Sequence, residues 1–205
     1  YFKDENGNNV DGITVKIIIN GVTYSRTSEN GEASIGLNLN SGKYNVITTY
    51  SGNKTIVVNN TVNIKPTIYS DDVVKMYRNS TQYQAKFVDK NGEILKDIPV
   101  TFNINGVIYT RVTNENGIGK LNLNLPQGKY ILTATNPITH EMRSNNITIL
   151  PTITNNRDIV KYYKNGTQYV VTLIGKDGQK VGSGETVEFN INGVFYRSEE
   201  RRVGK

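Results

Sequence analysis

Side chains that could take part in catalysis are sparse in this sequence of 205 residues. The single histidine, His140, follows the turn-forming residues 136–139, so we expect it in a solvated loop. A nucleophile needs a base beside it, and a general acid needs a partner that shifts its pKa. The acidic residues stand singly in turns, as at Asp89 and Asp177, and form no recurring pair. The sequence therefore predicts no catalytic residue and a protein that is not an enzyme.

Calcium is the metal that the acidic residues suggest first. Two Asp-x-Asn-Gly segments, residues 4–7 and 89–92, resemble half of a calcium loop. A complete EF-hand loop needs further oxygen ligands and a distal Glu, so we interpret both segments as hairpin turns. The adjacent acids Asp71 and Asp72 are a better candidate, but residues 156–158 read Asn-Arg-Asp at the corresponding place. We predict no metal-binding and no cofactor-binding residue, and calcium at such junctions stays an open alternative.

Covalent modification is the other chemistry that the sequence raises. An isopeptide bond would join Lys75 to Asn145 or Asn146, but it also needs a buried acid between them, and no such acid recurs. Lys75 is more simply a solvated residue on an edge strand, where lysine discourages edge pairing. N-glycosylation is a second alternative, because five Asn-x-Ser/Thr sites are present. They are Asn53, Asn59, Asn79, Asn146 and Asn165.

The charge pattern does not indicate a nucleic-acid or membrane partner. The formal net charge is +6, but the basic residues are interspersed with Asp and Glu. Lys and Arg alternate with Tyr in residues 75–78 and 161–164, which a solvated sheet face explains better than a nucleic-acid site. No apolar run is long enough to span a bilayer. The absence of cysteine excludes disulfides and thiolate metal sites.

The composition predicts that strands position these side chains. The β-branched residues Val, Ile and Thr number 63, whereas Ala occurs three times, so an all-β fold is favoured over a helical one. Asn is counted at 28 and Gly at 19, and both tolerate the positive φ angles of tight turns.

Internal repetition is the strongest signal in the sequence. The Asn-Gly pairs that begin at positions 20, 105 and 192 are each followed by Val and, two residues later, Tyr. Pro-Thr-Ile occurs at 66–68 and again at 151–153, so the period is about 85 residues. We expect an N-terminally truncated repeat at 1–66, a complete repeat at 67–151 and a C-terminally truncated repeat at 152–196. Residues 197–205, RSEERRVGK, look like the translation of a sequencing adapter and are expected to be non-native.

Within residues 67–151, short alternating runs predict seven antiparallel strands in two packed sheets. The expected strands are 73–77, 82–88, 100–104, 107–112, a run through Leu121, Leu123 and Leu125, 130–135 and 146–150. The expected core is Val100, Phe102, Ile104, Leu121, Leu123, Tyr130 and Leu132. Asn105-Gly106 predicts a two-residue type I′ hairpin. Gly-Lys-Tyr at 42–44 and 128–130 predicts a tyrosine corner, in which Tyr44 and Tyr130 bond the backbone; an aromatic sugar platform is the alternative.

The runs VTFNINGVIYTR, TNENGIGKLNLNL and PQGKYILTAT resemble the tandem bacterial-type Ig-like repeats of adhesin-like cell-surface proteins. The similarity covers most of residues 1–196 and is greatest to the repeats of gut methanogenic archaea. It implies an extracellular protein of the cell surface or cell wall, whose repeats mediate spacing and attachment. The resemblance leaves two alternatives open, a carbohydrate- or protein-binding module and an accessory domain of a surface enzyme. A surface glycan or a protein of another cell is the class of ligand it implies.

The two outer repeats are incomplete in complementary ways. The first lacks its opening strands and the last lacks its closing strands, so each is expected to expose apolar surface and unpaired edges. We therefore expect self-association through these ends, in which one chain completes another.

Overall fold

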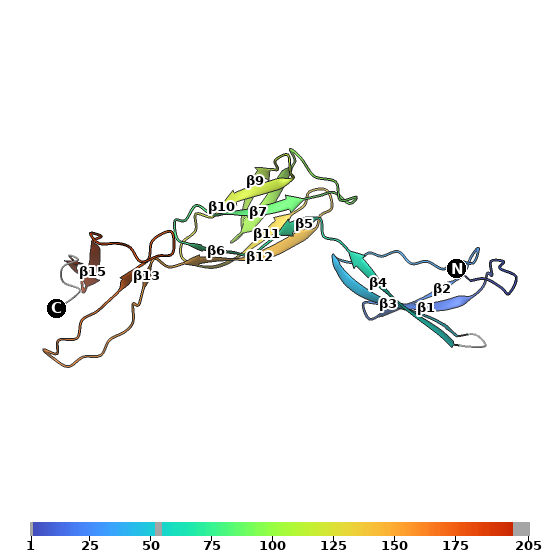
Figure 1. Ribbon diagram of the computed structural model, residues 1–205, viewed down its shortest axis with the longest axis horizontal. Helices are drawn as coiled ribbons and strands as arrows, with labels where there is room; N and C mark the ends of the chain where they lie inside the picture. The colour runs from blue at the N-terminus through green and yellow to red at the C-terminus, as the bar shows by residue number, and fades with distance from the viewer. Residues whose placement is uncertain (1, 52–54, 199–205) are drawn as a thin grey trace. The chain divides into compact units, whose positions relative to one another are not determined.

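The computed structural model describes residues 2–51 and 55–198 (Figure 1). Within these ranges the chain forms strands, turns and loops, and no residue is helical. The packing divides the chain into two compact units, Tyr1–Pro66 and Thr67–Lys205. The expectation of an all-β protein is confirmed.

Within the unit Thr67–Lys205, the buried hydrophobic cluster lies in residues 67–151, which we call the central domain. Its strands are β5 (Ile68–Ser70), β6 (Val73–Met76), β7 (Gln82–Phe87), β8 (Pro99–Ile104), β9 (Val107–Val112), β10 (Ile118–Asn122), β11 (Gly128–Thr135) and β12 (Met142–Leu150). One sheet has the order β10-β7-β5 and the other has the order β6-β12-β11-β8-β9 (Figure 1). Two such sheets, with the first strand shared between them, make an immunoglobulin-like sandwich.

The division of the first strand corrects the sequence-based prediction of a single strand at 73–77. The chain first pairs with β7 as β5, breaks at Asp71 and Asp72, and then joins the other sheet as β6. The domain therefore has eight strands instead of seven. Because the chain keeps its direction as it crosses, β6 runs parallel to β12, whereas the remaining ladders of this domain are antiparallel.

The core lies between the two sheets and contains the predicted alternating residues. Val100, Phe102, Ile104, Leu121, Leu123 and Leu132 are all buried, joined by Tyr83, Phe87 and Ile147 from other strands. Tyr130 was expected in the core but is only half-buried, because its ring packs at the rim of the cluster. Its hydroxyl donates to the carbonyl oxygen of Pro126 at 2.9 Å.

The same bond occurs in the first unit, where the Tyr44 hydroxyl donates to the Asn40 carbonyl at 2.9 Å. The tyrosine corner is thus confirmed at both predicted positions. The Asn-Gly hairpins are confirmed as well, with φ angles of 52° and 78° at Asn105 and Gly106. Asn20-Gly21 and Asn192-Gly193 adopt the same left-handed pair of conformations.

The first unit contains one sheet of the expected sandwich. It is built from β1 (Thr14–Ile19), β2 (Val22–Thr27), β3 (Gly42–Ser51) and β4 (Thr55–Ile64), in the order β2-β1-β3-β4. Residues 33–40 match the region of β10 in sequence but form no strand. In the central domain β10 pairs with β7. The described part of the first unit contains only the end of a β7 counterpart, Phe2, whose N–H donates to the Gly31 carbonyl as that of Phe87 donates to the Gly117 carbonyl.

Residues 152–198 contain short ladders only. β13 (Ile153–Thr154) pairs with β14 (Thr172–Leu173), and β15 (Val187–Ile191) pairs with β16 (Val194–Ser198). Residues 155–171, between β13 and β14, form no strand (Figure 1). β16 continues past Tyr196 through Arg197 and Ser198, and the rest of the proposed adapter-derived tail lies outside the described residues.

Candidate functional site

Two polar networks, each built around a buried asparagine, connect parts of the central domain that are distant in sequence, and the first lies where the chain enters it. Thr67 directly precedes β5, and its backbone N–H and hydroxyl both donate to the Glu141 carboxylate, the hydroxyl at 2.6 Å. The fully buried Asn136 donates through Nδ2 to the Val88 carbonyl at 2.8 Å and to the Thr67 hydroxyl at 3.2 Å. We call Thr67, Asn136 and Glu141 the entry clamp. It ties the first residue of the domain to the loop between β11 and β12.

The second network lies where the first strand changes sheets. Asn145, on β12, is buried, and its Oδ1 accepts hydrogen bonds from the Ser70 hydroxyl at 2.6 Å and the Tyr83 hydroxyl at 2.8 Å. Its Nδ2 donates to the Asp72 carboxylate at 3.2 Å, which also accepts from the backbone and side-chain N–H groups of Asn146. The Asn145 network thus joins β5, β7 and β12 across both sheets.

The environment shifts the pKa values of two groups in this network. Hydrogen bonds from the Asn146 side chain and backbone, and from Asn145, hold the pKa of Asp72 below its usual value. Burial raises the pKa of the Tyr83 hydroxyl. Both groups therefore keep at neutral pH the protonation states that these hydrogen bonds require, an ionised Asp72 and a neutral Tyr83.

Lys75 corrects a second prediction. We expected a solvated lysine on an edge strand, but the residue is buried, and its ammonium donates to the carbonyl oxygens of Leu123 at 3.1 Å and Thr81 at 3.2 Å. Burial lowers the pKa of Lys75. The β6–β12 register places Lys75 opposite Ile149, four residues from Asn145. An isopeptide bond between Lys75 and Asn145 or Asn146 therefore does not fit, because Lys75 and the two Asn lie at different places along the ladder.

The acidic turns are closed by their own backbone. Asp89 accepts hydrogen bonds from the N–H groups of Asn91 and Glu93, both at 2.8 Å, and Asp4 accepts equivalent bonds from Asn6 and Asn8. A hydrogen bond from the Asn8 side chain, together with these backbone bonds, lowers the pKa of Asp4, and the backbone N–H of Glu93 makes the largest contribution to the lowered pKa of Asp89. Our interpretation of these segments as turns is confirmed. Within residues 2–51 and 55–198, no group of three or more acidic or His side chains could hold a metal ion.

The remaining predicted residues lie apart from both networks. His140 is exposed in the loop between β11 and β12, with a positive φ of 59°. Among the glycosylation sites, Asn59, Asn146 and Asn165 are exposed, and the half-buried Asn79 donates to the Lys176 carbonyl at 2.8 Å. Asn53 lies outside the described residues. In the part of the chain that the structure describes, no helix is long and apolar enough to cross a membrane.

The sequence pattern alone did not single out Asn136, and it placed Asn145 only as an isopeptide candidate. The signal that could have found Asn145 is its position within an alternating strand, since it takes the inward place two residues before Ile147. The Asn145 network links strands by hydrogen bonds, and the entry clamp fixes the position of Thr67 at the start of the domain.

No known protein family matches the chain, and no curated protein matches it. Among solved structures, it is similar to a Ca²⁺-stabilised adhesin with which an Antarctic bacterium binds ice, with 19% identity over 94% of this chain and a TM-score of 0.28. It is also similar to the fibronectin(III)-like modules of Clostridium thermocellum CbhA, with 16% identity over 80% of this chain, 88% of those modules and a TM-score of 0.31. A third similarity is to domains 4–9 of the surface layer protein SbsC, with 15% identity over 96% of this chain, 36% of that chain and a TM-score of 0.30.

The match spans 55% of the adhesin, about half of its length. Similarities this distant carry no argument about function, and the assignment of the fold rests on the sheet order and register described above.

Proposed function

We propose that the chain is a non-enzymatic segment of an extracellular cell-surface protein, in which immunoglobulin-like repeats with boundaries at 1–66, 67–151 and 152–196 space and display other parts. The observation that carries this proposal is the entry clamp, which fixes Thr67 immediately after Pro66. The loop between β4 and β5 is only residues 65–67, and the one between β12 and β13 only residues 151–152. Short linkers that contain proline restrict bending between domains.

The second linker has one of the same attachments. The Val88 N–H donates to the Thr67 carbonyl at 2.9 Å, and the Ile174 N–H donates to the Thr152 carbonyl at 2.8 Å. Each linker therefore ends in a threonine whose carbonyl is bonded to the domain that follows. This repeated attachment supports a semi-rigid spacer over a freely jointed one. The cell wall of a gut methanogenic archaeon is the setting that the sequence resemblance adds to this proposal.

A binding module is the second candidate, and the loop between β11 and β12 favours it. Ile138 is 53% exposed there, beside the exposed Pro137 and His140. The matching loop of the first unit, around residues 51–55, has a different sequence. Loops at one end of a sandwich are where binding residues concentrate. Under this candidate, the loop contacts a surface glycan or a protein of another cell.

Small-angle scattering of a chain of four tandem copies of residues 67–151 tests the spacer function. We expect an extended particle whose maximum dimension grows linearly with the number of copies. Replacing the linker prolines with glycine should shorten the average dimension, since the linkers become flexible. A compact particle contradicts the spacer function. So does a maximum dimension equal to that of the glycine variant. Saturable binding in a glycan array that is lost with Ile138→Ser and His140→Ser would place the binding module first.

A further inference from the structure

The five-stranded sheet of the central domain ends in β9, which is a long and apolar strand for an unpaired edge. It has six residues, whereas the other edge strands of the domain, β5, β6 and β10, have three, four and five. Ile108 and Val112 of β9 are 66% and 63% exposed. Edges of this kind pair readily with another chain unless they are short, charged or covered. Because β9 is not short, it needs protection of another kind.

The hairpin register shows which backbone groups of β9 face the open edge. Asn105-Gly106 is a two-residue loop, so the residues that flank it exchange hydrogen bonds, and bonded pairs then alternate along the ladder. In this register, three residues of β9 direct their backbone N–H and carbonyl groups away from β8: Ile108, Thr110 and Val112. Thr110 is the middle one, so it would lie at the centre of an antiparallel pair of two β9 strands.

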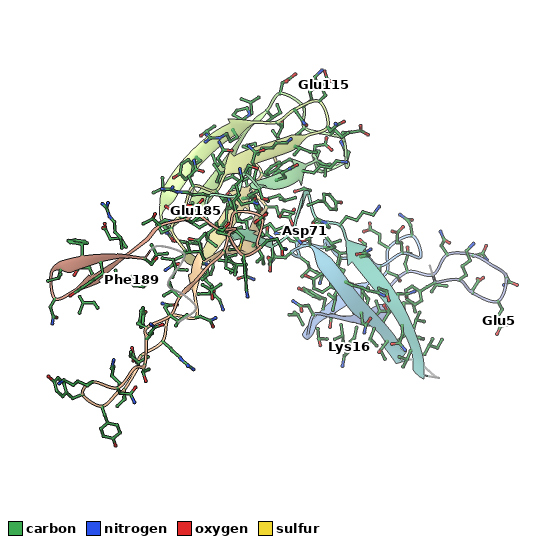
Figure 2. The ribbon with its side chains drawn as sticks, turned by 60° about the vertical axis from the view of Figure 1, so that its left-hand side comes forward. Glu5, Lys16, Asp71, Glu115, Glu185 and Phe189 are labelled. Carbon is green, nitrogen blue, oxygen red and sulfur yellow. The ribbon has the colours of Figure 1, made fainter. Side chains whose placement is uncertain are left out.

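Arg111 covers the middle of this edge. Its Nη1 donates to the Thr110 carbonyl oxygen at 2.7 Å, and its guanidinium carbon lies 5.7 Å from the centroid of the Tyr109 ring. Tyr109 packs against the core and supports the guanidinium through its ring face. Arg111 is the one charged residue of β9, and the next along the chain, Glu115, lies in the turn after the strand (Figure 2). We call Tyr109 and Arg111 the edge pair of β9.

The first unit repeats this arrangement on its own edge strand, β2. The Arg26 Nη1 donates to the Ser25 carbonyl oxygen at 2.8 Å, and the guanidinium carbon lies 5.6 Å from the centroid of the Tyr24 ring. β2 is the outermost strand of its sheet, and the Asn20-Gly21 hairpin directs the Ser25 carbonyl outward, as it is at Thr110. Two separately packed units therefore place the same groups in the same geometry, so the arrangement is a feature of this edge strand and not of one side chain.

We infer that the edge pair prevents β9, and likewise β2, from pairing with the same strand of a second copy of the chain. A symmetric antiparallel pair would place the two Thr110 residues opposite each other, and each Thr110 carbonyl would have to accept the N–H of the other. Arg111 already occupies that carbonyl. Pairing would also bring two guanidinium groups close together and remove them from water, which is costly. The inference concerns the edge alone and does not depend on the proposed spacer function.

Sedimentation of the full chain tests whether the edge pair prevents association. Arg111→Ala removes both the hydrogen bond and the charge, and should raise the association constant about tenfold or more above that of the natural chain. Arg26→Ala should act in the same way through β2. Lys86→Ala is the matched control, because it removes the same charge from β7, a strand with a partner on each side. Equal association of the Arg111→Ala and Lys86→Ala chains overturns the inference.

Proline at position 110 tests whether the association uses the edge of β9. The Thr110 N–H points away from β8, so Thr110→Pro removes a donor from the open edge and leaves the bonds of the β8–β9 ladder in place. In the Arg111→Ala chain, this second substitution should return association to the level of the natural chain. Association that persists in the double variant overturns the inference, because it would then use another surface.

Amide hydrogen exchange identifies the paired strand directly in the Arg111→Ala chain, without the proline. The outward amides of β9 should exchange quickly in dilute solution and about tenfold or more slowly at concentrations where copies associate. These amides are those of Ile108, Thr110 and Val112. The Tyr109 amide is bonded within the ladder and should be protected at both concentrations. Exchange of the three outward amides that does not depend on concentration overturns the inference.

Discussion

At the scale of single residues, the stability of the central domain depends on polar side chains that its core encloses. Asn145 and Asn136 each bond several donors and acceptors from other parts of the domain, and in the described chain every fully enclosed polar side-chain atom has a hydrogen-bond partner. Such networks stabilise a fold when complete and are costly when one member is removed. They specify which strands meet, which apolar packing alone does not.

Replacing Asn145 with Leu should destabilise the central domain by about 2 to 4 kcal/mol, since the hydroxyls of Ser70 and Tyr83 lose their acceptor inside the core. Urea unfolding of residues 67–151 measures the change. Asn146→Ala is the control, because Asn146 is exposed and its backbone N–H still donates to Asp72. A loss no larger than that of the control would contradict the role assigned to Asn145.

The lowered pKa of Asp72 predicts an acid-sensitive contribution to stability. Below the usual aspartate pKa of about 4, Asp72 is protonated in the unfolded chain but still ionised in the folded one. The free energy of unfolding therefore falls as the pH falls. The contribution is fully present above that value and is lost as the pH falls through the lowered pKa. Asp72→Asn should flatten the pH dependence of urea midpoints below pH 4 relative to the natural chain. An unchanged slope would contradict this prediction.

At the scale of elements, the short strand β6 depends on Lys75 for its attachment to the loops around it. Lys75→Ala should cost about 2 to 3 kcal/mol, because two carbonyls lose a charged donor within a closed environment. Lys86→Ala, on the exposed face of β7, should change the unfolding free energy by less than about 0.5 kcal/mol. Equal effects of the two substitutions, measured by thermal unfolding, would show that the buried position of Lys75 adds nothing.

The connection into β11 depends on the tyrosine corner. Tyr130→Phe removes the hydroxyl that bonds the Pro126 carbonyl while keeping the ring, so we expect a loss of about 1 kcal/mol. Tyr109→Phe is the control, since Tyr109 is likewise half-buried against the core. The free energies of unfolding of the two variants, measured with urea, should differ by this amount. Equal free energies would show that the Tyr130 hydroxyl does not stabilise the domain.

At the scale of the whole chain, stability is unevenly distributed. Buried side chains concentrate in the central domain, whereas residues 155–170 are largely exposed and form no strand. Amide hydrogen exchange should therefore be slowest in β7, β8 and β11 and fastest in residues 155–170, by several orders of magnitude. Uniform protection along a monomeric chain would contradict the uneven distribution.

What the sequence by itself determined is local. The Asn-Gly pairs specify hairpins through their own backbone preferences, and the alternation around Phe102 and Leu132 specifies which face turns inward. The Asn145 network does not follow from local sequence, because Asn145 lies 75 residues from Ser70 and 62 residues from Tyr83 along the chain. Only the tertiary structure decided that Lys75 is buried and that the first strand divides at Asp71 and Asp72. The physical reason is that a polar side chain may enter a core only where distant strands supply its partners, and those partners exist only once both sheets have closed.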